Sequence, residues 1–467
     1  MRGFTGFDLT PAQREALETL LQWRQAGTHG VLEGFAGTGK TTVLMALVLE
    51  LACRGEADAL HVTAPTHKAA QVLNQKITEV CDAAGVEVPA EAGTIHSRLS
   101  LKPKRTKPGE PEAFVTSKKP KLTRGGYLVL DECSMVGRFL FDYVMECAAA
   151  YGVTVLFSGD PKQLRPVNEP GISRSFALGG KVVLNEVLRH DGAVLRLATA
   201  IRSMHKFALP VIKTDVGATS RVNAYLSRET LTESWLNQVA AEHEAQQASD
   251  TVMLCWTNRE RRTANRRARG RIYGPDVPEF MAGDELVMLS PFTAGDQVLL
   301  ANNADVRITA AELVEWQPVK GLEFVYSCWK LYVEDFGDIH VLTEAESGQH
   351  KRDWQRIGKE ISAAVEEAKA EHDRVSKLAN RDEKTWYAAM DNLRSAKERW
   401  GTEYYALKEA FAWVDHRYAL TVHKSQGSTY PAVFVNPDVL EAKDERPALM
   451  YVAVTRAAKE VHHLALG

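Results

Sequence analysis

Residues 30–45 read GVLEGFAGTGKTTVLM, and this stretch decides the fold class of the chain. An apolar segment leads into a Gly-rich turn of the pattern G-x-x-x-x-G-K-S/T, and a second apolar run with helical character follows. In a strand–loop–helix context of this kind, backbone N–H groups and the helix N-terminus surround a phosphate group. A chance Gly-rich turn has no need of either flanking element. The stretch therefore predicts a phosphate-binding loop within an α/β domain.

The loop also predicts the nucleotide and the metal ion. Lys40 would reach the β- and γ-phosphates of ATP, and the hydroxyl of Thr41 would ligate Mg²⁺. The loop residues that we expect to contact ATP are Gly37, Thr38, Gly39, Lys40, Thr41 and Thr42.

A second motif lies at residues 127–132, where YLVLDE forms an apolar run that ends in two carboxylates. Asp131 would hold Mg²⁺ through its hydration shell, and Glu132 would orient and deprotonate the attacking water. The alternative is an Asp that only caps the following turn. Because the run follows a phosphate-binding loop, we interpret the pair as the catalytic carboxylates of an NTPase.

Composition indicates a soluble, multidomain protein. The chain has 467 residues, of which 45% are hydrophobic and 25% are charged, and its formal net charge is -3. This length predicts two to four domains, and the charge balance means that any basic surface must be local. The six cysteines are scattered, which disfavours a zinc or iron–sulfur site. With no signal peptide and no long apolar run, we expect a cytoplasmic protein of a bacterial cell or a phage-infected host, without membrane contact.

The pattern along the chain predicts two α/β domains, the second interrupted. Strand-like and helical runs alternate over residues 1–185, which favours a parallel sheet covered by helices on both faces. The same alternation returns at 186–282 and 411–467. Between these segments, residues 283–345 have the pattern of a small β-barrel, and residues 346–410 that of a helical hairpin. At about 100–125 the first domain is interrupted by an insertion rich in Lys and Pro.

Several segments together resemble the motifs of superfamily 1 helicases, in order and in spacing. They are QREAL (13–17), DECS (131–134), SGDPKQLRPV (158–167), VHKSQG (422–427) and YVAVTRA (451–457). The resemblance is closest to the 5′-to-3′ branch, superfamily 1B, that includes RecD-like enzymes and the Dda helicase of T-even phages. It implies an ATP-dependent DNA helicase that moves 5′ to 3′ on single-stranded DNA. It also implies two RecA-like P-loop NTPase domains with ATP between them, an inserted pin, an SH3-like β-barrel and a helical tower.

The resemblance assigns further residues of the ATP site. Gln13 matches the glutamine that reads adenine, and Gln163 matches the one that senses the γ-phosphate. Arg189 and Arg456 match arginines that the second domain supplies. Two guanidinium groups from the opposite domain would stabilise charge on the transferred phosphoryl group and make domain closure depend on ATP. The alternative for Arg189 is a surface salt bridge.

The same resemblance assigns residues to the DNA. Hydroxyl groups can hold phosphates and imidazoles can stack on bases, and neither contact reads sequence. Phe114, the only aromatic residue of the Lys-rich insertion, would stack against the junction base pair. A purely structural role, or a solvated loop in the case of Phe114, is the alternative. The other residues placed along the strand are Pro65, Thr66, His67, Thr94, His96, Thr421 and His423.

Other functions remain open at this level. An RNA helicase of the same superfamily differs in sugar choice, and no residue here reads a 2′-hydroxyl. A nucleotide-switched module that holds DNA without unwinding it is a second alternative, whereas the sequence has no separate carboxylate cluster for a nuclease. Seven arginines at 259–271 either flank DNA or form a solvated helix face. We expect a monomer that acts at fork junctions in DNA replication, recombination or repair, with single-stranded-DNA-binding or replication proteins as partners.

Overall fold

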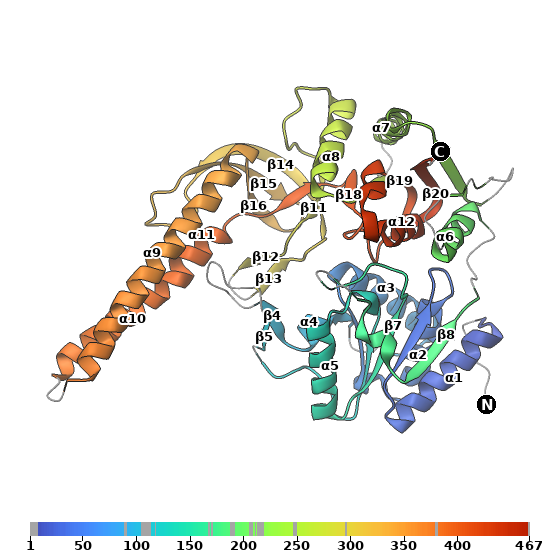
Figure 1. Ribbon diagram of the computed structural model, residues 1–467, viewed down its shortest axis with the longest axis horizontal. Coiled ribbons are helices and arrows are strands. Elements are labelled where there is room, and N and C mark those ends of the chain that lie inside the picture. The colour runs from blue at the N-terminus through green and yellow to red at the C-terminus, as the bar shows by residue number, and fades with distance from the viewer. Residues whose placement is uncertain are drawn as a thin grey trace. The chain divides into compact units, whose positions relative to one another are not determined.

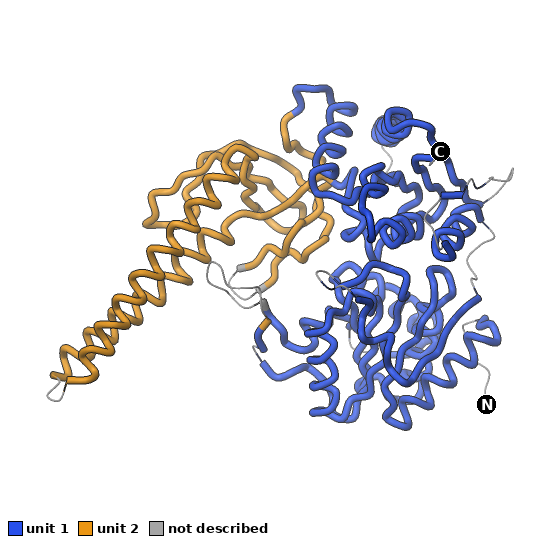
Figure 2. Tube along the Cα trace, viewed as in Figure 1, with its two compact units in different colours: residues 1–102, 115–277, 417–467 blue, residues 103–114, 278–416 orange. Residues whose placement is uncertain are grey.

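The computed structural model describes residues 8–87, 91–103, 114–116, 118–166, 169, 171–186, 192–204, 209–210, 212, 219–245, 250–294, 297–378 and 382–465. The chain divides into two compact units, which Figure 2 distinguishes by colour. Unit 1 comprises residues 1–102, 115–277 and 417–467, and unit 2 comprises residues 103–114 and 278–416.

The first lobe of unit 1 is built on a six-stranded sheet in the order β3-β2-β6-β7-β1-β8. All neighbouring strands run parallel, so each connection must cross the sheet. The strands are β1 (Gly30–Gly34), β2 (Leu60–Ala64), β3 (Gly93–Thr94), β6 (Tyr127–Leu130), β7 (Thr154–Gly159) and β8 (Gly180–Leu184). The helices of this lobe are α1 (Pro11–Ala26), α2 (Lys40–Cys53), α3 (His67–Ala84), α4 (Ile95–Arg98) and α5 (Arg138–Tyr151).

Helices cover both faces of this sheet, as the sequence predicts. Neighbouring residues of one strand belong to different cores, because successive side chains point to opposite faces. Leu32 packs in the core that includes α1, α2 and α3, whereas Val31 packs in the core that includes α4 and α5. The parallel α/β fold class is therefore confirmed for this part of the chain.

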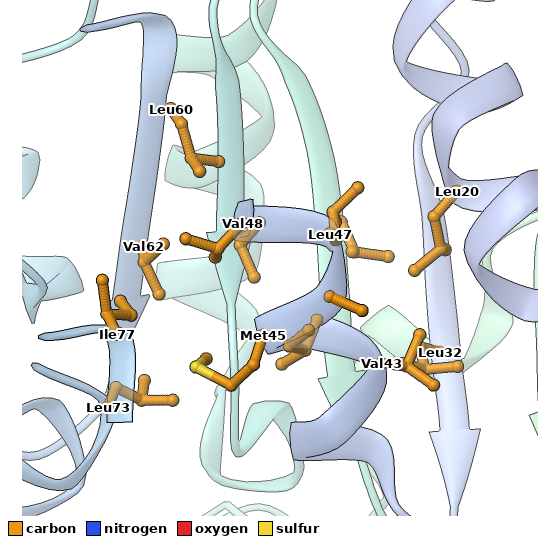
Figure 3. Close-up of a cluster of buried hydrophobic side chains, with 14 of the residues drawn as sticks. Leu20, Leu32, Val43, Met45, Leu47, Val48, Leu60, Val62, Leu73 and Ile77 are labelled. Carbon is orange, nitrogen blue, oxygen red and sulfur yellow. The ribbon is translucent and has the colours of Figure 1, made fainter. Parts of the chain in front are cut away.

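Helix α2 is the central element of the first core, which Figure 3 shows in close-up. Its side chains lie between those of β1, β2 and α3, and each fully buried Leu or Val contributes about 1.5–3 kcal/mol. The helix that follows the Gly-rich loop is therefore firmly anchored in the lobe. The labelled residues of this core are Leu20, Leu32, Val43, Met45, Leu47, Val48, Leu60, Val62, Leu73 and Ile77.

The start of α1 is fixed by a reciprocal cap. The Thr10 hydroxyl accepts a hydrogen bond from the Gln13 backbone N–H, and the Gln13 side chain accepts one from the Thr10 N–H. Pro11 occupies the first turn, where a missing N–H has no cost. The cap brings Gln13, only 3% exposed, to a fixed position.

The second lobe of unit 1 contains a five-stranded sheet in the order β18-β10-β19-β20-β9. Its neighbouring strands are parallel as well. The strands are β9 (Arg221–Tyr225), β10 (Thr251–Cys255), β18 (Ala419–Thr421), β19 (Tyr430–Val435) and β20 (Ala457–Leu464). The helices are α6 (Ala193–Ser203), α7 (Arg228–Glu244), α8 (Asn258–Tyr273) and α12 (Arg446–Thr455).

Unit 2 contains a five-stranded antiparallel sheet in the order β16-β15-β14-β11-β17. Its strands are β11 (Glu285–Met288), β14 (Asp305–Trp316), β15 (Tyr326–Val333), β16 (Gly337–Leu342) and β17 (Val414–His416). A separate antiparallel pair consists of β12 (Phe292–Ala294) and β13 (Gln297–Leu300). Because β17 pairs with β11, the chain returns to unit 1 at Arg417, later than the residue 411 that the sequence suggests. Whether this sheet is an SH3-like barrel stays a prediction.

Two long helices of unit 2, α9 (Glu344–Ser376) and α10 (Glu383–Arg399), lie side by side in Figure 1. The Trp386 indole N–H donates to the Ser376 hydroxyl over 3.0 Å, which joins the end of α9 to the start of α10. Ile357, Ile361 and Val365 of α9 are buried in one core with residues of the sheet and of α10. The short helix α11 (Ala406–Lys408) follows. Among the described residues, no helix has the length and apolar character needed to cross a bilayer.

The base of the Lys-rich insertion is a two-stranded sheet of β4 (Leu101–Pro103) and β5 (Phe114–Thr116). On the side of unit 1, the Lys121 backbone N–H donates to the Arg98 carbonyl over 2.8 Å. The Ser100 hydroxyl donates to the Lys119 carbonyl over 3.0 Å. Residues 104–113 and 117 of the predicted pin lie outside the described residues.

Candidate nucleotide and nucleic-acid site

The Gly-rich loop between β1 and α2 has the backbone shape of an anion cradle. Gly37 and Gly39 have φ angles of 84° and 83°, a left-handed conformation that favours glycine. Gly39 is also the N-cap of α2 and offers no capping side chain. The first N–H groups of α2 are thus left for a ligand, and the helix dipole favours a negative one.

Lys40 contacts the loop itself in this structure. Its ammonium group donates to the carbonyl of Gly34 over 2.7 Å and to that of Phe35 over 3.1 Å. The Thr38 hydroxyl donates to the same Phe35 carbonyl over 2.9 Å. Phosphate oxygens carry full negative charge and form stronger bonds with an ammonium group than carbonyls do. A phosphate in the loop would therefore draw Lys40 away from Gly34 and Phe35.

Gln13 lies beside the loop, as the resemblance implies. Its amide nitrogen donates to the Thr38 carbonyl over 3.4 Å, while its amide oxygen caps α1. Both ends of this side chain are therefore engaged with the protein, although the amide nitrogen has a second hydrogen to donate. An adenine-reading role for Gln13 stays a prediction.

Asp131 and Glu132 follow β6 directly. The Asp131 backbone N–H donates to the Thr63 carbonyl over 2.9 Å, which ties the pair to the neighbouring strand β2. Glu132 has φ 53° and ψ 40°, a left-handed conformation that costs a non-glycine residue about 1–2 kcal/mol. Strain of this kind is typical of functional sites, where surrounding structure holds the residue in place.

The charge environment of Glu132 suits a general base. Burial raises the pKa of its carboxyl group, and the neighbouring Asp131 carboxylate raises it further, whereas Arg456 and Lys40 oppose the rise in pKa. A carboxylate with a raised pKa accepts a proton more readily near neutral pH. Because Arg456 belongs to the second lobe, both lobes act on this group.

The oxygen donors near the loop fit Mg²⁺. Thr41 in the first turn of α2 and Asp131 after β6 offer a hydroxyl and a carboxylate, both partly exposed. Mg²⁺ is usually held by one or two such oxygens together with phosphates and water, rather than by a full protein cage. Consistent with this, the described residues include no cluster of three or more His, Cys, Asp or Glu that could hold a metal ion.

Gln163 lies after β7, in a loop that both lobes contact. It is 6% exposed, and its amide oxygen has no hydrogen-bond partner among the described residues. Its backbone N–H donates to the Asp160 carbonyl over 3.2 Å. A buried oxygen without a hydrogen-bond partner costs free energy, so we expect a polar group to donate a hydrogen bond to it.

Arg456 follows α12 and is 7% exposed. Two of its guanidinium nitrogens donate to the Ser428 carbonyl over 3.3 Å and to the Thr455 hydroxyl over 3.4 Å. Its third nitrogen, Nε, has no partner among the described residues. The other predicted arginine, Arg189, lies outside the described residues.

Three contacts that the sequence analysis did not assign join the second lobe to the loop region. The Tyr451 hydroxyl of α12 accepts a hydrogen bond from the Ala36 backbone N–H over 3.1 Å and donates to the Asp160 carboxylate over 2.7 Å. The Arg202 guanidinium of α6 lies 3.6 Å from the ring centre of Phe35. Tyr451 and Asp160 stand inside the quoted segments YVAVTRA and SGDPKQ, but nothing in one sequence shows that they meet.

The threonines assigned to DNA all cap a turn at a strand end. Backbone N–H groups donate to the Thr66 hydroxyl from Ala69 over 3.2 Å, and to the Thr94 hydroxyl from Ser97 over 3.2 Å. The register pairs Ala64 with Thr94, so these caps belong to neighbouring strands. In the second lobe, the Thr421 hydroxyl accepts from the Lys424 N–H over 3.3 Å. Each hydroxyl keeps its own hydrogen, which a phosphate could accept.

Burial favours the neutral form of the histidines assigned to DNA. Burial lowers the pKa of His67, His96 and His423, and the proximity of His67 further lowers the pKa of His96. A neutral imidazole can stack on a base without attracting a counterion. Pro65 precedes the Thr66 cap at the end of β2. Burial and the Arg261 charge also lower the pKa of Lys424 to about 8, a cation at this edge that the sequence analysis did not assign.

A loop of the second lobe packs against the first lobe, close to the residues that we assign to nucleic acid in each lobe. A Cβ placed on Gly427 would lie 3.2 Å from the Cβ of Ala69, so the loop after His423 packs against the first turn of α3. Phe114 lies in β5, is assigned to unit 2 and is 41% exposed. The Arg-rich segment forms α8, in which Arg261 and Arg269 are buried, so it is not simply a solvated face.

Comparison with known families finds two matches in this chain. A family model described as an AAA domain matches residues 8–214, and one described as a UvrD-like helicase C-terminal domain matches residues 416–462. A curated relative, an uncharacterized protein of Acanthamoeba polyphaga mimivirus, is 23% identical over 513 residues. That alignment covers 96% of this chain and 98% of the relative.

Similar solved structures include several Pif1 helicases. Two coordinating Pif1 helicases at forked double-stranded DNA give 16% identity, 98% coverage of this chain, 92% of that chain and a TM-score of 0.48. The Bacteroides Pif1 helicase with ADP-AlF3 and single-stranded DNA gives 15% identity, the same coverages and a TM-score of 0.47. The Candida albicans Pif1 helicase gives 15% identity, coverages of 99% and 96%, and a TM-score of 0.42.

Proposed function

We propose that this chain is an ATP-dependent 5′-to-3′ DNA helicase of superfamily 1B, from the branch that includes RecD-like and Dda-like enzymes. The observation that carries the proposal is the contact of the second lobe with the phosphate loop, through Tyr451 on Ala36 and Arg202 on Phe35. A motor of this kind needs ATP between two lobes, so that nucleotide binding and release change how the lobes meet. The match of residues 416–462 to a UvrD-like helicase C-terminal domain supports the same reading.

The loop residues, with Gln13, would bind ATP, and Thr41 and Asp131 would hold the Mg²⁺ that offsets phosphate charge. Glu132 would orient and deprotonate the attacking water, and Gln163 would sense the γ-phosphate. Arg456 and Arg189 would stabilise the charge that develops on the transferred phosphoryl group. The unpaired Gln163 oxygen and Arg456 Nε support these roles, because each lacks a partner within the described protein.

Single-stranded DNA would run along the carboxyl edges of the two parallel sheets, which is where ligands bind in folds of this class. Thr66 and Thr94 would hold phosphates on the first lobe, and Thr421 on the second. Pro65 and the neutral imidazoles of His67, His96 and His423 would lie against bases and sugars. These contacts ignore base identity, as movement along DNA requires.

The inserted elements would convert movement into strand separation. In this proposal the Lys-rich insertion is a pin, with Phe114 against the junction base pair, and α9 and α10 are a tower that supports it. The antiparallel sheet of unit 2 would be the SH3-like barrel. We further propose a monomeric cytoplasmic enzyme that acts at fork junctions in replication, recombination or repair, with a single-stranded-DNA-binding protein or replication and recombination proteins as partners.

The test of the proposed activity is ATP hydrolysis measured alone, with single-stranded DNA and with RNA of the same sequence. We expect strong stimulation by DNA and weak stimulation by RNA. Stimulation by RNA alone would favour an RNA helicase. DNA binding that depends on nucleotide, without any stimulated hydrolysis, would favour a nucleotide-switched clamp and would contradict the proposal.

A further inference from the structure

Side chains of both lobes contact three consecutive residues of the phosphate loop, Gly34, Phe35 and Ala36. We call them the relay segment. Lys40 donates to the carbonyls of Gly34 and Phe35, over 2.7 and 3.1 Å. The second lobe holds the rest: Arg202 lies over the Phe35 ring, and Tyr451 accepts the Ala36 N–H. The relay segment is therefore held by Lys40 of the first lobe and by two side chains of the second lobe.

The Tyr451 hydroxyl is fully used in this arrangement. It accepts from Ala36 and donates to the Asp160 carboxylate over 2.7 Å, while Asp160 also accepts from the Lys162 N–H over 2.9 Å. Asp160 is fully buried and Tyr451 is 3% exposed, so neither group can exchange these bonds for water. Burial and the Asp160 carboxylate raise the pKa of Tyr451, which keeps the hydroxyl protonated as a donor.

Tyr451 and Arg456 are carried by one helix. Tyr451 lies within α12 and Arg456 is its C-cap residue, so a displacement of the helix moves both. Arg456 in turn donates to the Ser428 carbonyl, in the loop that packs on Ala69 at the start of α3. A continuous series of contacts thus joins the phosphate loop to the residues proposed for DNA.

We propose that Tyr451 and Arg202 are positioning residues that read the state of the relay segment and transmit it to the nucleic-acid side. This inference rests on the proposed function. When phosphate draws Lys40 away, the Gly34 carbonyl loses its ammonium donor, the Phe35 carbonyl keeps the Thr38 hydroxyl as donor, and the segment can shift. Because Tyr451 and Arg202 hold that segment, α12 and α6 follow the shift. Without the Tyr451 hydroxyl, the loop would still bind ATP, but the second lobe would no longer respond to it.

The test compares single-stranded DNA affinity of the full chain with and without a non-hydrolysable ATP analogue. The ratio of the two dissociation constants measures the coupling between the sites. Tyr451→Phe removes the bond to Ala36 together with the bond to Asp160. We expect it to reduce this ratio about tenfold, which is the loss of one buried hydrogen bond to the relay segment expressed as an equilibrium. Affinity for the analogue should change much less than the ratio does.

Tyr430→Phe is the matched control. Tyr430 is a buried tyrosine of the same lobe whose hydroxyl has no hydrogen-bond partner among the described residues. The identical chemical change there should leave the coupling ratio at its wild-type value. Arg202→Gln provides a second, independent variant that should also reduce the ratio, and Arg202→Lys, which keeps the positive charge, should restore part of it.

The outcomes separate this inference from the proposed function. If the wild-type coupling survives in both Tyr451→Phe and Arg202→Gln, the inference is overturned and the helicase proposal stands. If the wild-type protein neither binds single-stranded DNA nor changes its affinity with nucleotide, both fail together. A reduced ratio in the two variants, with Tyr430→Phe unchanged, supports the inference.

Discussion

The ammonium group of Lys40 lies in the phosphate loop, and in this structure it donates hydrogen bonds to the carbonyls of Gly34 and Phe35. We expect Lys40→Ala to lower ATP turnover by about 10³-fold, because transition-state charge on the phosphoryl group loses its nearest donor. Single-stranded DNA binding without nucleotide should be largely preserved. Steady-state hydrolysis and filter binding measure the two effects, with the exposed Lys443→Ala as control. Near-normal turnover in Lys40→Ala would contradict the assignment of the loop.

Glu132 should impose an acid limb on the activity. Its pKa is raised by burial and by Asp131, so it gains a proton at a higher pH than an ordinary glutamate does. Turnover should fall as pH drops through that raised pKa, and Glu132→Gln should lose about 10²–10⁴-fold in turnover at pH values above it, with a smaller loss in acid. A pH profile of both proteins tests this, and an unchanged acid limb in the variant would rule out Glu132 as the base.

The sign of the stability effect follows from the same shift. A carboxyl whose pKa is raised in the folded state opposes folding at pH values above that pKa, where the group must ionise while buried. Glu132→Gln should therefore unfold at the same temperature as the wild type or higher at pH 7, and the difference should vanish in acid. Thermal melts at two pH values measure it. A clear loss of stability in Glu132→Gln at pH 7 would mean that the carboxylate stabilises the folded state.

Local chemistry made part of the site predictable at the level of single residues. The cap formed by Thr10 and Gln13, and the left-handed glycines of the loop, follow from rules that act over a few residues. The contact between Ala36 and Tyr451 joins residues 415 positions apart in the chain, so no local pattern contains it. The same holds for the Arg202 contact with Phe35.

At the scale of elements, Phe114 on β5 gives the sharpest test of the Lys-rich insertion. We expect Phe114→Ala to reduce duplex unwinding several-fold more than movement along single-stranded DNA, because only separation needs an apolar wedge at the junction. Val115→Ala is the matched control, since Val115 is also 41% exposed but points to the opposite face of the strand. Unwinding by strand displacement and translocation by removal of a bound streptavidin are the two readouts. Equal losses in both would remove the wedge role.

The parallel strands and their helices were the most predictable elements, since alternation of apolar runs with amphipathic segments is a strong local signal. Strand β17 shows where this signal ends. This strand has only three residues, 414–416, and their sequence also fits the start of the following α/β segment. In the structure they pair with β11 in unit 2. Strand pairing depends on which backbone is nearby, and a single sequence does not contain that information.

At the scale of the whole chain, unit 1 is discontinuous and unit 2 is inserted in it. The predicted secondary-structure pattern of the sequence changes in the same region. The α/β character breaks off and resumes, so the insertion is visible without a structure. The polarity of movement has no such signature, because the contacts proposed with phosphates and bases would not depend on strand direction. It rests on the resemblance alone.

The most direct test of the account is ATP-dependent strand separation on two duplexes, one with a 5′ single-stranded tail and one with a 3′ tail. We predict unwinding of the 5′-tailed duplex and none of the 3′-tailed duplex, and Lys40→Ala should unwind neither. Unwinding from the 3′ tail alone would contradict the 5′-to-3′ assignment while leaving the motor in place. Activity on neither duplex, with hydrolysis still stimulated by DNA, would contradict the claim that this chain alone is a helicase.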